Sequence, residues 1–112
     1  MSGTKAVYEP IRSIDSSTFT GSYQAIGTPI TNPSSILKIV NNSNRLVTIS
    51  TNGVDDDDIL PAGAFTLYDI SSDAQAVAGG ANLRFPANTQ FYAKGIAGGT
   101  GLVYLVTIYQ GG

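Results

Sequence analysis

The sequence predicts an all-β domain, a single antiparallel β-sandwich or jelly-roll-like fold with an extended N-terminal arm. Short segments rich in β-branched and aromatic residues alternate with Gly, Pro and Asn turns along the whole chain. No segment carries an apolar stripe of helical period over two turns. The 112 residues leave room for one hydrophobic core only. We therefore expect an arm over residues 1–14 and a sandwich domain over residues 15–112.

The N-terminal segment has strand-like residues but a proline in its middle. Residues 6–14 include Val7, Tyr8 and Ile11, whereas Pro10 cannot donate to a strand ladder. Such a segment belongs at a sheet edge or in an extended arm. We expect the arm to be disordered when free and to add to an open sheet edge on another subunit. The alternative is a frayed terminus without a role.

The centre of the chain predicts a β-hairpin. Residues 36–40 and 46–50 are short, rich in β-branched residues and separated by a polar corner. If these two strands pair, side chains on one face meet across the pair because side chains alternate along a strand. The residues expected to meet in this way are Leu37, Ile39, Val47 and Ile49.

The other elements follow in order. We expect a strand over residues 16–26 broken by Gly21, a loop over 71–81 with at most one short helical turn around 74–77, and a short strand over 82–85. A turn over 86–89, a strand over 90–94 and a last strand over 102–109 complete the chain. The side chains expected to be mostly buried are Leu37, Ile39, Val47, Ile49, Phe65, Leu67, Phe91, Tyr104 and Val106.

The last strand is apolar on both of its alternating faces, whereas a strand of an isolated sandwich should be polar outside. Either a loop covers its outer side or another subunit does. Only 12% of the residues are charged, which suits a surface buried against neighbours. We therefore expect self-association. The candidate interface residues are Val7, Tyr8, Ile11, Val103, Leu105 and Tyr109.

The composition argues against catalysis. The chain has neither His nor Cys, which removes the commonest general base, metal ligand and thiol nucleophile. We expect no enzyme activity, no catalytic residues and no cofactor. The only dense charge is the run Asp55, Asp56, Asp57 and Asp58, a weak candidate Ca²⁺ site whose spacing does not fit an EF-hand loop. We expect a solvated acidic corner there and no essential metal.

Other partner classes are also disfavoured. The net charge is −2 and the six basic residues are scattered, so we expect no nucleic-acid binding. No apolar run approaches the ~20 residues of a membrane span, and no hydrophobic signal-peptide region is evident. Six tyrosines could line a sugar-binding face, although such residues more often occupy core and rim positions.

A series of short motifs follows in a fixed order along the chain: SYQAIGTPI (22–30), NP (32–33), IVNNS (39–43), VTISTNGV (47–54), LPAG (60–63) and FYAK (91–94). This series resembles small structural proteins encoded in the morphogenesis regions of tailed bacteriophages. The order of the motifs, more than any single motif, carries the resemblance, which spans roughly residues 8–109.

The resemblance implies a non-enzymatic virion protein, assembled in the host bacterial cytoplasm and without active-site residues. The expected role is that of a capsid decoration (cement) protein, for which a small symmetric oligomer such as a trimer is favoured. Its expected partners are copies of itself and other virion proteins such as the major capsid protein. A neck or tail component, or a glycan- or receptor-binding module, remains an alternative.

Overall fold

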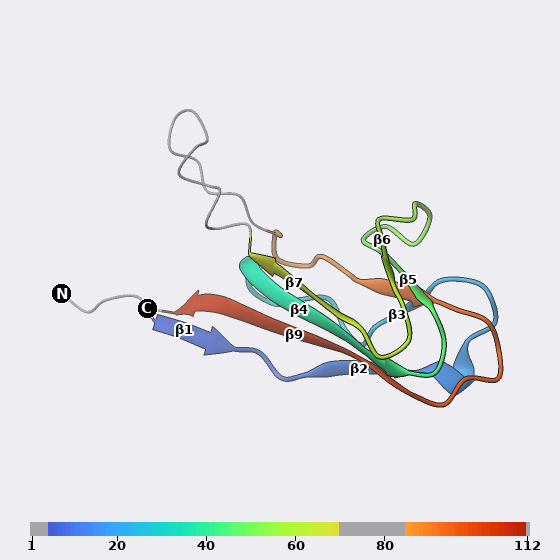
Figure 1. The fold of residues 1–112 in the computed structure, drawn as a ribbon. Coiled ribbons are helices and arrows are strands. Elements are labelled where there is room, and N and C mark those ends of the chain that lie inside the picture. The colour runs from blue at the N-terminus through green and yellow to red at the C-terminus, as the bar shows by residue number, and fades with distance from the viewer. Residues whose placement is uncertain (1–4, 70–84, 112) are drawn as a thin grey trace.

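The computed structural model describes residues 5–69 and 85–111 of the chain. They form two antiparallel sheets packed as a sandwich (Figure 1), which confirms the predicted all-β class. A single 3₁₀ turn, η1, covers Ser16–Thr18. The strands are β1 (Lys5–Tyr8), β2 (Arg12–Asp15), β3 (Gln24–Ala25), β4 (Ser34–Ser43), β5 (Val47–Ser50), β6 (Asp58–Leu60), β7 (Phe65–Asp69), β8 (Tyr92–Lys94) and β9 (Gly101–Gly111).

The larger sheet is organised around its two longest strands. Its strand order is β1-β9-β4-β7, and β2 also pairs with β9, so β9 holds both N-terminal strands along one edge. The pairing of β4 with β9 runs from Ser34↔Tyr109 to Ser43↔Gly101. Pro10 lies between β1 and β2, where no ladder bond is needed. This edge position is one of the two that the sequence predicts for a proline-containing segment.

Gly101 starts β9 at a point where the backbones of β4 and β9 almost touch. Its φ is 97°, a left-handed value that side chains rarely adopt. A Cβ at this position would lie 2.2 Å from the carbonyl oxygen of Asn42. Only glycine fits, so this residue fixes where β9 enters the sheet beside β4.

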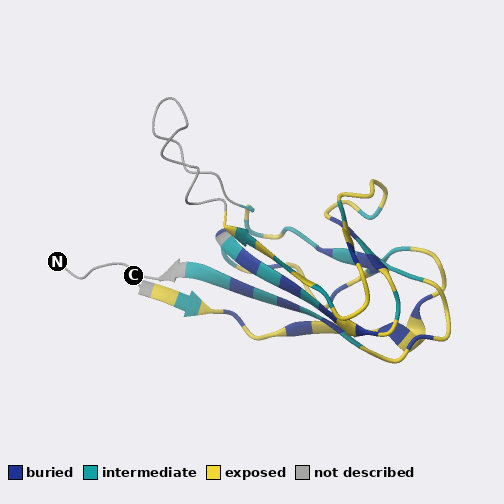
Figure 2. Ribbon diagram, viewed as in Figure 1, coloured by how far each residue is buried: buried dark blue, intermediate teal, exposed yellow. Residues whose placement is uncertain are grey.

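The smaller sheet has the order β3-β8-β5-β6 and covers the inner face of the larger one. The core between the sheets therefore takes every second residue of the facing strands (Figure 2). The fully buried apolar side chains are Phe19, Ile26, Ile30, Leu37, Ile39, Val47, Ile49, Leu60, Phe91, Ala93, Val103 and Leu105.

Five of the nine predicted core residues are buried as expected: Leu37, Ile39, Val47, Ile49 and Phe91. The prediction is wrong for β7 and β9, because the assumed register is one residue out. Phe65 and Leu67 are 65% and 58% exposed. Tyr104 and Val106 also face outward and are half-buried, whereas Val103, Leu105 and Thr107 point into the core.

The predicted hairpin between β4 and β5 does not form, because these strands belong to different sheets. β4 pairs with β7 and β9, and β5 pairs with β6 and β8. Leu37 and Val47 do belong to one buried cluster, but they meet across the sandwich instead of along a ladder. The polar corner after β4 is therefore a crossover from one sheet to the other.

Asn41 explains how the chain makes this crossover. Its side chain is fully buried, and its Nδ2 donates to the carbonyl oxygens of Arg45, Leu60 and Pro61 at 2.8–3.1 Å. Its Oδ1 accepts from the backbone amide and the hydroxyl of Ser43. A residue on β4 thus satisfies backbone groups at the ends of β5 and β6, which fastens the two sheets together.

Two further expectations need correction or fall outside the described residues. Residues 16–26 form η1 and the two-residue β3 instead of one strand, and Asp15 caps η1 by accepting from Ser17 N. Phe85 makes an isolated bridge with Ser34. The rest of the predicted 82–85 strand and the 71–81 loop lie outside the described residues.

Candidate functional site

The side of the five-stranded sheet that points away from the smaller sheet carries a group of apolar side chains, three of which are exposed: Tyr8, Phe65 and Leu67. We call this side the outer face. Because cross-strand partners share a face, the register places Val40 beside Phe65 and Tyr104, and Ile108 beside Ile36 and Tyr8. The central side chains of this face are half-buried. Its apolar members are Tyr8, Ile36, Val40, Phe65, Leu67, Leu102, Tyr104, Val106 and Ile108.

Three charged residues lie on this face in the register: Lys38 near its middle, Asp69 opposite Ile36 and Asp15 opposite Leu102. Lys38 lies on β4 between Leu67 of β7 and Val106 of β9 in the register. Its stem can lie along these apolar neighbours while the ammonium group reaches solvent. A single cation inside an apolar patch would favour a partner surface that is apolar with a carboxylate or carbonyl oxygen near its centre.

The predicted interface role is wrong for two of the six candidate residues. Val103 and Leu105 are fully buried in the sandwich, so they cannot contact another subunit. Tyr8 and Ile11 are about two-thirds exposed. Val7 and Tyr109 pair with each other on the opposite side of the sheet, half-buried. For Val7, Tyr8, Ile11 and Tyr109, an interface role stays a prediction.

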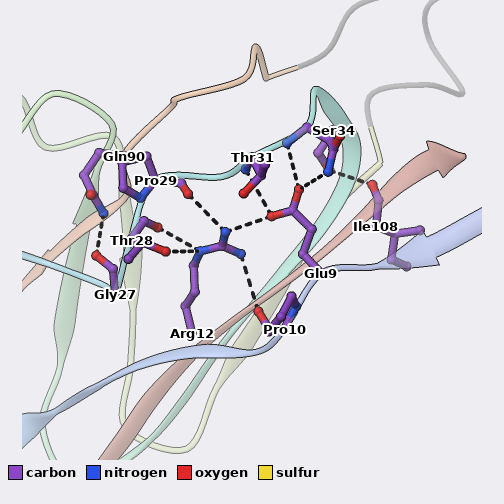
Figure 3. Close-up of polar contacts among 11 residues, drawn as sticks. Glu9, Pro10, Arg12, Gly27, Thr28, Pro29, Thr31, Ser34, Gln90 and Ile108 are labelled. Atoms are coloured by element: carbon purple, nitrogen blue, oxygen red, sulfur yellow. Dashed lines mark hydrogen bonds and ion pairs between the residues drawn. The ribbon is translucent and has the colours of Figure 1, made fainter.

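A buried ion pair fastens the N-terminal segment to the sandwich (Figure 3). Arg12 Nη2 donates to Glu9 Oε1 at 2.8 Å, and both side chains are almost fully buried. Arg12 also donates to the carbonyl oxygens of Thr28 at 2.8 Å and Pro29 at 3.0 Å. Glu9 accepts from Asn32 N and Nδ2 at 2.8 and 2.9 Å, and from the amide of Thr31. Each nitrogen of the Arg12 guanidinium and both oxygens of the Glu9 carboxylate thus have a hydrogen-bond partner.

The pKa of Glu9 reflects this arrangement. Burial alone would raise the pKa of the Glu9 carboxyl, because it disfavours the charged form. The hydrogen bonds from Asn32, Thr31 and Arg12 outweigh burial and hold the pKa below its ordinary value. Glu9 is therefore ionised at neutral pH, and the pair acts as a structural clasp instead of a reactive group.

The sequence predicts a free N-terminal arm, but in the structure residues 5–8 and 12–15 are paired strands. β1 pairs antiparallel with residues 108–111 of β9, and β2 pairs with residues 102–105. Glu9 N continues this contact by donating to Thr107 O at 3.1 Å. The segment is extended, as expected, but its ladder partner is β9 of the same chain. Because β1 is an edge strand of this sheet, its pairing with β9 occupies one of its two sides, and docking onto an edge of another subunit stays a prediction.

The acidic run is held in a defined loop by its own neighbours. Asp55 accepts from Asn52 Nδ2, and Asp57 from the amide and hydroxyl of Thr51. Asp56 accepts from the Tyr23 hydroxyl at 2.5 Å and lies 3.1 Å from Lys94 Nζ, and both contacts lower its pKa. Asp58 accepts from the Tyr68 hydroxyl. Each carboxylate thus has a different partner, and the described residues contain no group of three that could hold a metal ion.

The tyrosines do not gather on one sugar-binding face. Tyr23 and Tyr68 use their hydroxyl groups to hold the acidic run, and burial together with Asp56 or Asp58 raises the pKa of each. Tyr8 and Tyr104 belong to the outer face. Their spread over both sheets is typical of core and rim positions.

Sequence reasoning found the apolar excess of β9 but missed the residues that complete the outer face. The missed residues are Phe65 and Leu67 on β7 and the cation Lys38 on β4. Alternation along β7 offered a signal, since Thr66 and Tyr68 are the inward pair there. Either face of such a strand could have been the inner one from sequence alone.

Comparison of the chain with protein-family models, with curated proteins and with solved structures finds no match. The resemblance to phage structural proteins therefore remains a prediction. Among the residues that the structure describes, no helix is long and apolar enough to cross a membrane.

Proposed function

We propose that this chain is a non-enzymatic structural protein of a tailed-phage virion, a capsid decoration (cement) protein that stabilises the head shell by protein–protein contacts. The observation that carries the proposal is the outer face. Contiguous apolar surface of this kind, with Phe65 and Leu67 more than half exposed, is typical of a surface that a partner covers.

The size of the outer face supports a contact with another protein. The nine paired positions of β4 and β9 give a length of about 30 Å, and four strands give a width of about 15–20 Å. The resulting ~500 Å² is comparable to the largest apolar patch of a typical monomer, which is often functional, and approaches one side of a small specific interface. The chain's low charge fits the same role, because few side chains would lose hydration on burial.

The test is cosedimentation of the purified protein with empty heads of the phage that encodes it, produced without this protein. The unsubstituted chain should sediment with the heads. Leu67→Lys should lose most of this binding, because it places a charge in the centre of the contact. Ala25→Lys is the matched control, since it adds the same charge to an exposed position of the other sheet. Both substitutions are on the surface and should change the free energy of unfolding by less than about 0.5 kcal/mol.

Two results would contradict the proposal. If the unsubstituted protein does not bind heads but binds isolated necks or tails, the alternative of a neck or tail component replaces it. If heads retain Leu67→Lys as well as the unsubstituted chain, the outer face is not the surface that docks.

A further inference from the structure

A hollow on the four-stranded sheet joins apolar and basic side chains. It has a volume of about 230 Å³ and lies beside the start of β5 and the end of β8. Leu46 and Ile96 at its wall are 54% and 73% exposed, so the wall presents apolar surface to solvent. Its lining consists of Gly21, Arg45, Leu46, Thr48, Lys94, Gly95 and Ile96.

Two of the chain's six basic residues line this hollow, and no acidic residue does. Arg45 has five N–H donors, and in the described part of the chain it uses one of them, from Nη2 to Gly98 O at 3.2 Å. Its Nε is buried and has no hydrogen-bond partner there. Lys94 is partly neutralised by Asp56. The hollow therefore suits an apolar side chain that carries a carboxylate beside it.

The loop 51–57 of this same chain presents that combination. Val54 is 76% exposed, and the exposed Asp55 follows it directly. Figure 1 shows the loop standing clear of the two sheets, between β5 and β6. Asn52 Oδ1 accepts from the amides of both residues at 2.8 and 2.9 Å. The tip is thus held in one shape, so that binding would cost little ordering entropy.

Within one chain this tip does not fill the hollow. Asp56, at the base of the loop, is held by Tyr23 and Lys94 of its own chain, whereas neither Val54 nor Asp55 lines the hollow. The hollow lies at the beginning of β5 and the loop follows its end. A two-fold axis perpendicular to β5 exchanges these two ends, so each loop of a pair can meet the other chain's hollow.

We propose that two copies of this chain associate by inserting the tip Val54–Asp55 of each into the hollow of the other, with Asp55 facing Arg45. The complementary charges and the two exposed apolar walls carry the contact. It is separate from the outer face and needs no shell, so two joined copies keep both outer faces free.

The test measures self-association by sedimentation equilibrium in the absence of any phage component. The unsubstituted protein should dimerise, and the dimer should weaken when NaCl rises from about 0.05 M to about 0.5 M. Arg45→Glu and Asp55→Arg should each raise the dissociation constant at least about tenfold, because like charges then face each other twice in the dimer. Circular dichroism and thermal unfolding would show that each variant is folded.

The decisive experiment mixes the Arg45→Glu and Asp55→Arg variants. In a mixed pair, both contacts regain opposite charges, so an equimolar mixture should form a heterodimer although neither variant self-associates. A single chain with both substitutions should dimerise for the same reason. Val54→Ser, which removes the apolar tip without a charge change, should also weaken the dimer.

Three outcomes would overturn the proposal: a monomeric unsubstituted protein at the highest soluble concentration, unchanged association of the single variants, and failure of the mixture to associate. A failure here leaves the head-binding result of Leu67→Lys untouched, and the reverse also holds. The two proposals can therefore fail separately.

Discussion

Arg12 and Glu9 form a 2.8 Å ion pair in which the side chains keep only 8% and 4% of their surface exposed. The pair lies between β1 and β2 and reaches the loop at residues 28–32 (Figure 3). It therefore ties the N-terminal strands to a segment outside the ladder. The next three predictions test this tie.

Arg12→Met should destabilise the fold by about 3 kcal/mol, because it leaves a buried carboxylate without its cation. The remaining donors from Thr31 and Asn32 keep the cost at the lower end of the usual range. Urea unfolding followed by circular dichroism measures the change. A loss below about 0.5 kcal/mol would show that the amide donors alone satisfy Glu9.

The stability should fall in acid, in part through Glu9. Its pKa is lower in the folded chain than its ordinary value of 4.5, so the folded state binds fewer protons than the unfolded state. The resulting stabilisation is complete above the ordinary value and is lost as the pH falls through the lower folded value. The pKa values of Asp15 and Asp56 are lowered as well. Unfolding curves of Glu9→Gln and of the unsubstituted protein should therefore converge as the pH falls below about 4.5.

Deleting residues 1–9 should destabilise the domain. The sequence alone predicts a folded truncation, because no core strand is removed. In the structure, the deletion removes β1 from β9 and leaves Arg12 without its carboxylate. We expect a clear fall in the melting temperature, measured by calorimetry. An unchanged melting temperature would mean that β1 contributes nothing to the isolated domain.

Ile49→Ala should cost about 2–5 kcal/mol, because Ile49 is 2% exposed in the core and the smaller residue leaves a cavity. Leu67→Ala is the matched control on the outer face and should cost far less in the monomer. Chemical unfolding of both variants at low protein concentration compares them. Equal losses would place Leu67 in a buried environment and contradict the outer face.

Tyr68→Phe should cost about 1.5–3 kcal/mol, because it removes a hydrogen bond to a charged carboxylate. The bond links β7 of the larger sheet to Asp58 of β6 in the smaller one. Tyr23→Phe is the comparison, since its Asp56 partner is exposed and its loss should be smaller. Thermal unfolding compares the stability losses of the two variants. A larger loss for Tyr23→Phe than for Tyr68→Phe would show that the inter-sheet bond is not the more stabilising one.

The sequence predicts the class of fold because turn residues and β-branched segments are local signals. It predicts the core where one face of a strand is clearly apolar, as for Leu37 and Ile39 on β4. It fails on β9, where both alternating faces are apolar and the pattern cannot say which one points inward. On β7, Phe65 and Leu67 are the most hydrophobic residues, yet they face outward.

The pairing of the neighbouring strands β4 and β5 is the second prediction that fails. The chain crosses from one sheet to the other between them, and the buried Asn41 donates to carbonyl groups of Arg45 and Leu60 at this crossover. No local pattern announces this role for one asparagine among several. The hollow also escaped prediction, because residues from three separate parts of the chain line it.

The antiparallel pairing of β1 with the end of β9 decides how the molecule would respond to a pulling force. Lys5 stands opposite Gly111, so the described ends of the chain lie side by side (Figure 1). A force that separates the two ends would open the ladder between β1 and β9 one hydrogen-bonded pair at a time. Such loading breaks a sheet at low force, whereas a load applied along the strands must break many bonds together. The molecule is thus mechanically weak across its termini and strong along the direction of β4 and β9.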